Sequence, residues 1–89
     1  MSIVFDPVKD IANQTKHGIS LNRAIDLDLD AAVRVEDTRF AYGEQRLIAF
    51  GPIDGRIHCL VYTKRDGLIR AISLRRANKK EVDFYEQET

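Results

Sequence analysis

Lys16 and His17 are the first pair of residues in the chain that could do chemistry together. Gly18 follows them and the residues before them repeat at helical spacing, so we expect the pair at the C-terminal end of a helix. The simpler interpretation is that two cations complement the negative end of the helix dipole. If this helix end faces a phosphate, however, the imidazole could transfer a proton near neutral pH and the ammonium could stabilise the transition state.

Basic residues gather in the last third of the chain. Residues 64–80 contain seven Lys or Arg and one acidic residue, Asp66, although 14 basic and 14 acidic residues give the whole chain a formal net charge of zero. Arg75 and Arg76 end a predicted strand just before a predicted helix, where guanidinium groups and free backbone N–H groups both favour phosphate. This segment either binds a polyanion or is an ordinary solvated surface.

Glu44 and Arg46 form a further candidate pair. They are two residues apart at the start of a predicted strand, so both would project from the same side of it. Without further partners they would make an exposed ion pair of little energetic value.

The sequence contains no recognisable site for a metal ion or a nucleotide cofactor. His17, His58 and Cys59 are not spaced as ligand pairs, and the five glycines are isolated from one another. A single cysteine excludes a disulfide framework, and Cys59 is expected in the core. We therefore expect chemistry without a cofactor or a metal.

The elements that must position these residues indicate one α+β domain spanning residues 1–89. Asp6-Pro7 is typical of a helix start, and Ser20 is predicted to cap a second short helix. The residues predicted to line the buried side of the first helix are Val8, Ile11, Ala12 and Thr15.

Four strands are predicted in series, at residues 31–36, 46–51, 56–63 and 68–75. Asp66-Gly67 is a strong signal for a tight hairpin between the last two, so the strands should form an antiparallel meander. Asn78 and Glu81 are spaced as a capping box that opens a final helix. The expected architecture is a four-stranded antiparallel sheet with two N-terminal helices and one C-terminal helix; residues 3–5 are also β-prone.

The hairpin predicts which residues share a face of the sheet. If Asp66 and Gly67 form the turn, Arg65 pairs with Leu68 and the facing pairs follow from there. The face expected under the helices carries Cys59, Val61, Thr63, Arg70, Ile72 and Leu74. The face expected to be open, and suited to stacking bases and holding phosphates, carries His58, Leu60, Tyr62, Ala71, Ser73 and Arg75.

Several blocks of the sequence together resemble a known family. Asp6-Pro7 with Lys9 precedes residues 13–20, NQTKHGIS; residues 43–46 read GEQR, residues 61–65 VYTKR and residues 69–77 IRAISLRRA, before a helix bearing Glu81 and Tyr85. In order and separation these blocks are similar to those of the BrnT-type ribonuclease toxins, from about residue 3 to residue 86.

This resemblance implies a RelE-like fold and a toxin of a type II toxin–antitoxin module that cleaves RNA and inhibits translation and growth. It implies a ribbon-helix-helix antitoxin as partner, with operator DNA bound only through the complex, which represses its own operon.

Without a metal, RNA cleavage would use the substrate's own 2′-hydroxyl as nucleophile. We expect His17 or Glu44 as the base. The residues expected to supply positive charge are Lys16, Arg46, Arg65, Arg75 and Arg76, and those expected to contact substrate are His58, Arg70 and Tyr85.

A rival interpretation is a catalytically inactive nucleic-acid-binding or co-repressor module, since such a module needs the same basic surface. No apolar run approaches the roughly 20 residues that span a bilayer, and no signal peptide is recognisable. We therefore expect a cytoplasmic protein that does not engage membranes.

Overall fold

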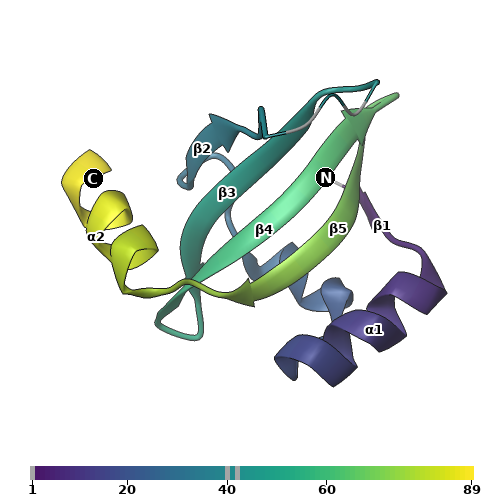
Figure 1. The fold of residues 1–89 in the computed structure, drawn as a ribbon, viewed down its shortest axis with the longest axis horizontal. Helices are drawn as coiled ribbons and strands as arrows, with labels where there is room; N and C mark the ends of the chain where they lie inside the picture. The colour runs from purple at the N-terminus through teal and green to yellow at the C-terminus, as the bar shows by residue number, and fades with distance from the viewer. Residues whose placement is uncertain (1, 40, 42) are drawn as a thin grey trace.

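The computed structural model describes residues 2–39, 41 and 43–89. Its elements follow in the order β1 (Ser2–Val4), α1 (Pro7–His17), the 3-10 helix η1 (Leu21–Asp26), β2 (Val33–Glu36), β3 (Arg46–Ile53), β4 (Arg56–Arg65), β5 (Leu68–Arg76) and α2 (Lys79–Glu88). The strands form a five-stranded sheet in the order β1-β5-β4-β3-β2 (Figure 1). None of the helices in the described part of the chain is long and apolar enough to cross a membrane.

Strands β2 to β5 form the predicted antiparallel meander. The prediction of a four-stranded, purely antiparallel sheet is wrong, because residues 2–4 add a fifth strand parallel to β5. Parallel neighbours need a crossover connection, and here α1, η1 and the rest of the meander lie between them in sequence. The second predicted helix exists as the 3-10 helix η1, capped by Ser20, whose hydroxyl accepts from the Asn22 N–H.

Two tight turns hold the meander. Asp54-Gly55 joins β3 to β4 and Asp66-Gly67 joins β4 to β5, and all four residues have φ between 51° and 76°. Two-residue hairpin turns with positive φ at both positions match the twist of the flanking strands. Asp54-Gly55 therefore brings the end of β3 back beside the start of β4, where the site described below is found.

Helix α1 begins and ends at the predicted signals. Asp6 accepts from the Val8 N–H at 2.9 Å, and Gly18, with φ of 71°, donates to the Gln14 carbonyl. The prediction that Val8, Ile11, Ala12 and Thr15 line its buried side is wrong, because all four are exposed and the buried residue of α1 is Asn13.

The reason for this orientation lies at the edge of β5. Strand β1 pairs only with residues 68–70, so the backbone of β5 further on needs other partners. The Asn13 side chain supplies them at Leu74, and α1 therefore lies against β5 through an amide rather than through aliphatic side chains.

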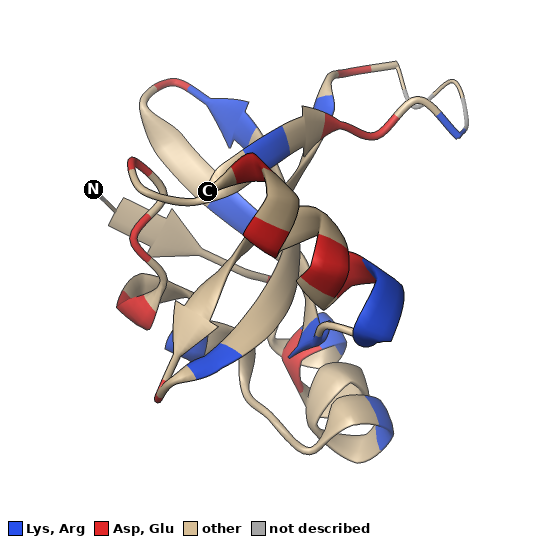
Figure 2. Ribbon diagram, turned by 90° about the vertical axis from the view of Figure 1, so that its left-hand side faces the viewer, with Lys and Arg blue, Asp and Glu red and all other residues tan. Residues whose placement is uncertain are grey.

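The hydrophobic core lies between one face of the sheet and the segment that contains η1. Its largest fully buried apolar side chains are Leu21, Leu60, Tyr62, Ile69 and Leu74. On the other face, α2 packs at one end of the sheet (Figures 1 and 2). There the Phe50 and Phe84 rings meet edge to face, with their centroids 5.8 Å apart. The capping box between Asn78 and Glu81 opens α2 as predicted.

The predicted assignment of the two sheet faces is wrong. Pairing follows the expected register from Arg65–Leu68 to Tyr62–Ala71, but an irregularity between Val61 and Tyr62 then shifts it by one residue. Beyond that point Leu60 pairs with Leu74 and His58 with Arg76. Strand β4 alternates regularly, and the face that was expected to be open, with Leu60, Tyr62 and Ala71, is the one that packs in the core. The shift adds a second change, because it puts Leu74 and Arg76 on that face in place of Ser73 and Arg75.

Candidate active site

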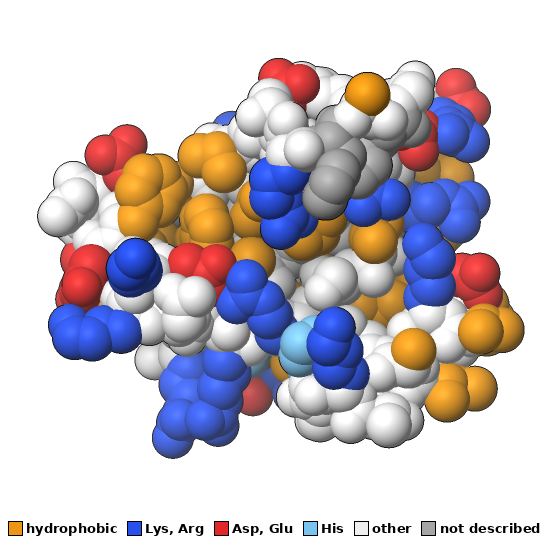
Figure 3. Space-filling view, viewed as in Figure 1, with side chains coloured by type: hydrophobic (Ala, Val, Ile, Leu, Met, Phe, Trp, Pro, Cys, Tyr) orange, Lys and Arg blue, Asp and Glu red, His pale blue; other side chains and the backbone are white. Residues whose placement is uncertain are grey.

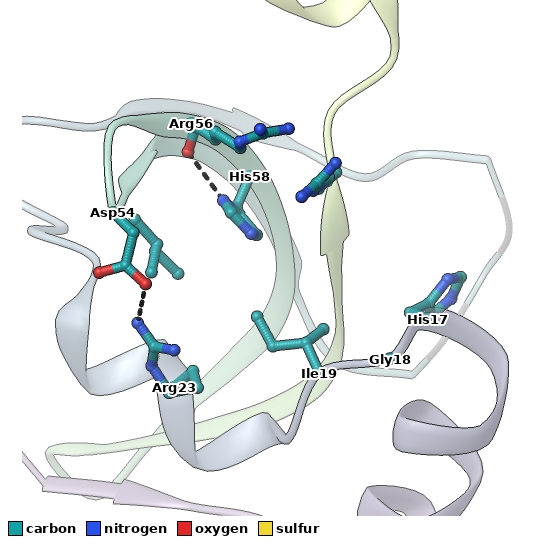
Figure 4. Close-up of a pocket in the computed structure, with 9 residues that line it drawn as sticks. His17, Gly18, Ile19, Arg23, Asp54, Arg56 and His58 are labelled. Atoms are coloured by element: carbon teal, nitrogen blue, oxygen red, sulfur yellow. Dashed lines mark hydrogen bonds and ion pairs between the residues drawn. The ribbon is translucent and has the colours of Figure 1, made fainter.

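A cleft of about 480 Å³ opens where the C-terminal end of α1, the β3–β4 turn and the end of β5 meet (Figure 4). The polar side chains that line it are His17, Arg23, Asp54, Arg56, His58 and Arg76. The chain has two histidines, and both line this cleft although 41 positions separate them in sequence. Figure 3 shows pale-blue histidine atoms beside blue Lys and Arg side chains in the lower half of the molecule.

His58 is held in one orientation by the backbone. Its ring is buried, and Nδ1 lies 2.7 Å from the carbonyl oxygen of Arg56. Because a carbonyl oxygen can only accept, Nδ1 carries the hydrogen and Nε2 is the nitrogen left to exchange a proton. Figure 4 shows this bond and the rest of the ring directed into the cleft. The prediction that His58 lies on an open sheet face is wrong, because Leu60 and Tyr62 on the same face of β4 are buried in the core.

His17 reaches the cleft from the last residue of α1. Burial lowers the pKa of its imidazole, and the nearby positive charges of Lys16 and Arg75 lower it further. A histidine with a lowered pKa is neutral at physiological pH and can accept a proton. His17 also lines a neighbouring groove with Lys9, Lys16 and Ser73, so it lies where two hollows meet.

The arginines of the cleft differ in what they already bind. Arg23 donates to Asp26 and to Asp54, each at 2.7 Å, and this contact lowers the pKa of Asp54. Arg56 and Arg76, by contrast, make no ion pair with any residue that the structure describes. These two guanidinium groups are therefore available to a phosphate.

Arg75 and Arg76, adjacent in sequence, serve different purposes. Arg76 pairs across the sheet with His58, whereas Arg75 pairs with Cys59 and projects to the other face. There Arg75 donates to both carboxylate oxygens of Glu81, at 2.8 and 2.9 Å. This contact lowers the pKa of Glu81 and ties the first turn of α2 to the sheet.

Glu44 and Arg65 lie away from the cleft. They form an exposed ion pair with each other, and Glu44 precedes β3, so its expected position on that strand beside Arg46 is wrong. Arg65 is nine residues along β4 from Arg56, which corresponds to about 30 Å. One phosphate therefore cannot contact both the cleft and this pair.

The remaining sequence-predicted residues lie on other parts of the surface. Arg46 and Arg70 each pair with Thr63 and flank it on the face opposite η1. The buried Thr63 hydroxyl has no hydrogen-bond partner among the described residues. Tyr85 is half-buried on α2. The structure thus brings Lys16, His17, His58 and Arg76 to one end of the sheet and spreads the others.

Sequence reasoning missed Arg56, Arg23 and Asp54. A signal for Arg56 was present, because it directly follows the Asp54-Gly55 turn and is two residues before His58, which places both on one face of a strand. Arg23 lines the cleft only because of the way η1 packs against the sheet, and no local pattern in the sequence predicts that packing. In the described ranges, no group of three or more His, Cys, Asp or Glu side chains could hold a metal ion.

Two imidazoles and two guanidinium groups that form no ion pair with the described residues suit, in an open cleft, a protein that acts on phosphodiesters. Residues 5–81 match the family described as the ribonuclease toxin BrnT of type II toxin–antitoxin systems. The chain therefore belongs to the BrnT family, which confirms the resemblance seen in the sequence and implies ribonuclease activity and a cognate antitoxin.

The fold is also similar to a solved structure. The 1.1 Å crystal structure of the Brucella abortus ribonuclease toxin BrnT is 25% identical in sequence, with a TM-score of 0.69. The alignment covers 89% of this chain and 99% of that one. No protein of curated function matches the chain.

Proposed function

We propose that this toxin cleaves RNA in the cleft between His17 and His58 without a metal ion. The observation that carries the proposal is the convergence of both histidines with Arg56 and Arg76 in one open cleft. Cleavage by the 2′-hydroxyl needs a proton acceptor, a proton donor and positively charged side chains that contact the negative non-bridging oxygens of the phosphate. These four residues are of the right types for all three tasks.

In the proposed reaction His17 takes the proton from a ribose 2′-hydroxyl as that oxygen forms a bond to the adjacent phosphorus. The bond from phosphorus to the 5′-oxygen of the next nucleotide breaks, and His58, which enters the step protonated at both ring nitrogens, gives that oxygen the proton on Nε2. The products are a 2′,3′-cyclic phosphate and a 5′-hydroxyl. Arg56 and Arg76 hold the non-bridging oxygens, and Lys16 adds positive charge beside His17.

The lowered pKa of His17 supports its assignment as the base, because a neutral imidazole is required at that point. The hydrogen bond from Nδ1 to the Arg56 carbonyl supports the assignment of Nε2 of His58 as the second proton-transfer atom. Glu44 is not proposed as the base, because its place beside Arg65 keeps it from the same phosphate.

In the cell, RNA loss would stop translation and growth until an antitoxin binds. We propose a ribbon-helix-helix antitoxin, with the complex repressing its own operon. This part rests on the family to which the chain belongs.

The chemistry is tested with purified protein and a short RNA in a buffer containing EDTA. We expect cleavage at the same rate with and without EDTA, products ending in a 2′,3′-cyclic phosphate, and no cleavage where the nucleotide 5′ to the scissile bond carries a 2′-deoxyribose. Products with a 3′-hydroxyl, or loss of cleavage in EDTA, would overturn the mechanism.

A further inference from the structure

Helix α1 presents its apolar side chains to solvent. Val8 and Ile11 are 73% and 66% exposed, and they are among the most exposed large hydrophobic residues that the structure describes. With Ala12 and Thr15, also exposed, they occupy positions i, i+3, i+4 and i+7, which form one continuous stripe along a helix. Figure 3 shows hydrophobic side chains standing out over α1, at the lower right.

The opposite side of the helix explains why the stripe is left open. Asn13 faces the sheet through its bonds to Leu74 and Ile19, and Asp10 accepts from the Ser20 hydroxyl and the Leu21 N–H. The contacts that attach α1 are therefore polar, and its apolar side takes no part in them. The apolar side of α1 is therefore exposed and available to a partner, and it is not buried in the protein's own core.

The charge beside this stripe has one sign. Lys9 and Lys16 are exposed, seven residues apart and so on the same flank of α1, next to Ala12. Neither makes an ion pair with a described residue. The carboxylate of Asp10 is already engaged with the loop after α1. An apolar stripe beside two free ammonium groups is complementary to an acidic amphipathic helix, whereas a nucleic acid would leave the aliphatic groups uncovered.

We propose that the stripe formed by Val8, Ile11, Ala12 and Thr15 is the docking surface for an acidic amphipathic helix of the cognate antitoxin. The apolar face of that helix covers Val8 and Ile11, and its acidic residues meet Lys9 and Lys16. Because α1 ends at His17, a chain seated there lies beside the cleft and blocks the approach of RNA. That consequence rests on the proposed function; the docking itself does not.

The experiment measures binding of the purified cognate antitoxin, taken as the protein whose co-expression restores growth, by calorimetry. Ile11→Ser is compared with Ile25→Ser, because Ile25 is the same residue type at nearly the same exposure, 68%, but on η1. We expect Ile11→Ser to weaken binding at least about tenfold, and Ile25→Ser to leave it unchanged. Both variants change exposed side chains, and circular dichroism confirms that each is folded.

A second pair of variants tests the charge. Lys9→Glu should weaken binding and reduce its dependence on salt, while Lys80→Glu, on α2, should change neither. Unchanged binding by the α1 variants, or a loss in Ile25→Ser as large as that in Ile11→Ser, would overturn the proposal. Since binding is read without RNA, failure of the cleavage mechanism would leave this result interpretable.

Discussion

The side-chain amide of Asn13 bonds to both backbone groups of Leu74. Its Nδ2 donates to the Leu74 carbonyl at 2.8 Å, and its Oδ1 accepts from the Leu74 N–H at 3.1 Å. The same Nδ2 donates to the carbonyl of Ile19, so one side chain joins the edge of β5, α1 and the loop that follows α1. His17 is one turn further along α1, and its place in the cleft therefore depends on this contact.

Replacing Asn13 with Leu should destabilise the protein by about 2–4 kcal/mol, because it leaves buried backbone groups of Leu74 and Ile19 without partners. Gln14→Leu is the matched control, since Gln14 is an exposed amide on the same helix. Urea unfolding, monitored by circular dichroism, gives the free energy of unfolding of each variant. Equal stability of the two variants would contradict the role given to Asn13.

Arg75→Ala and Arg76→Ala should separate stability from activity. Removing Arg75 breaks the two bonds to Glu81 and should cost about 1–2 kcal/mol of folding free energy. Removing Arg76 should leave stability within about 0.5 kcal/mol and lower kcat/KM for RNA by about 10²-fold. If Arg76→Ala retained full activity, the guanidinium group beside His58 would have no part in phosphate binding.

The Arg75–Glu81 contact should show a defined pH dependence. Because the pKa of Glu81 is lowered in the folded state, its contribution is fully present above the unfolded value near 4.5 and is lost as pH falls through the folded value. Glu81→Gln should therefore cost about 1–2 kcal/mol at pH 7, and the difference from the parent should shrink as the solution is made more acidic than pH 4.5. A difference that is constant with pH would show that the charge is not involved.

His17 should titrate below the ordinary histidine value of 6.5. The Lys16 ammonium favours the neutral imidazole, so Lys16→Gln should raise the pKa of His17, and the acidic limb of the cleavage rate should move to higher pH with it. Proton NMR of the imidazole measures the first effect. Lys9→Gln is the control, because burial, Lys16 and Arg75 are the causes that shift His17 and Lys9 is not among them. A midpoint above 6.5 in the parent would contradict the assignment of His17 as a base.

The sequence was sufficient for most elements because their signals are local. The Asp6 cap, the Asp66-Gly67 turn and the Asn78–Glu81 capping box depend on a few adjacent residues, and all three are present. The pairing of β1 with β5 depends on contacts between residues 66 positions apart, and no local pattern predicts them.

The site was predicted less well, for two physical reasons. The face of β4 that carries His58 was expected to be open, but Leu60 and Tyr62 on that face are buried in the core. The irregularity in the β4–β5 ladder also changes the partners on β5, so that Arg76 rather than Arg75 lies beside His58. The orientation of α1 was also inverted, because a polar contact through Asn13 outweighed the apolar stripe that usually decides which side of a helix is buried.

The central claim is that the cleft containing His17 and His58 is the active site, and that the surface around Arg70, on the sheet face opposite η1, is not. The most direct test compares single-turnover cleavage by His58→Asn and Arg70→Ala. The Asn amide can keep the hydrogen bond that Nδ1 gives to the Arg56 carbonyl while it removes Nε2. The account predicts that His58→Asn cleaves at least about 10²-fold more slowly than the parent, with unchanged stability. It predicts that Arg70→Ala cleaves at nearly the rate of the parent. Full activity in His58→Asn together with a large loss in Arg70→Ala would place the reaction on the sheet face around Arg70 and contradict the account.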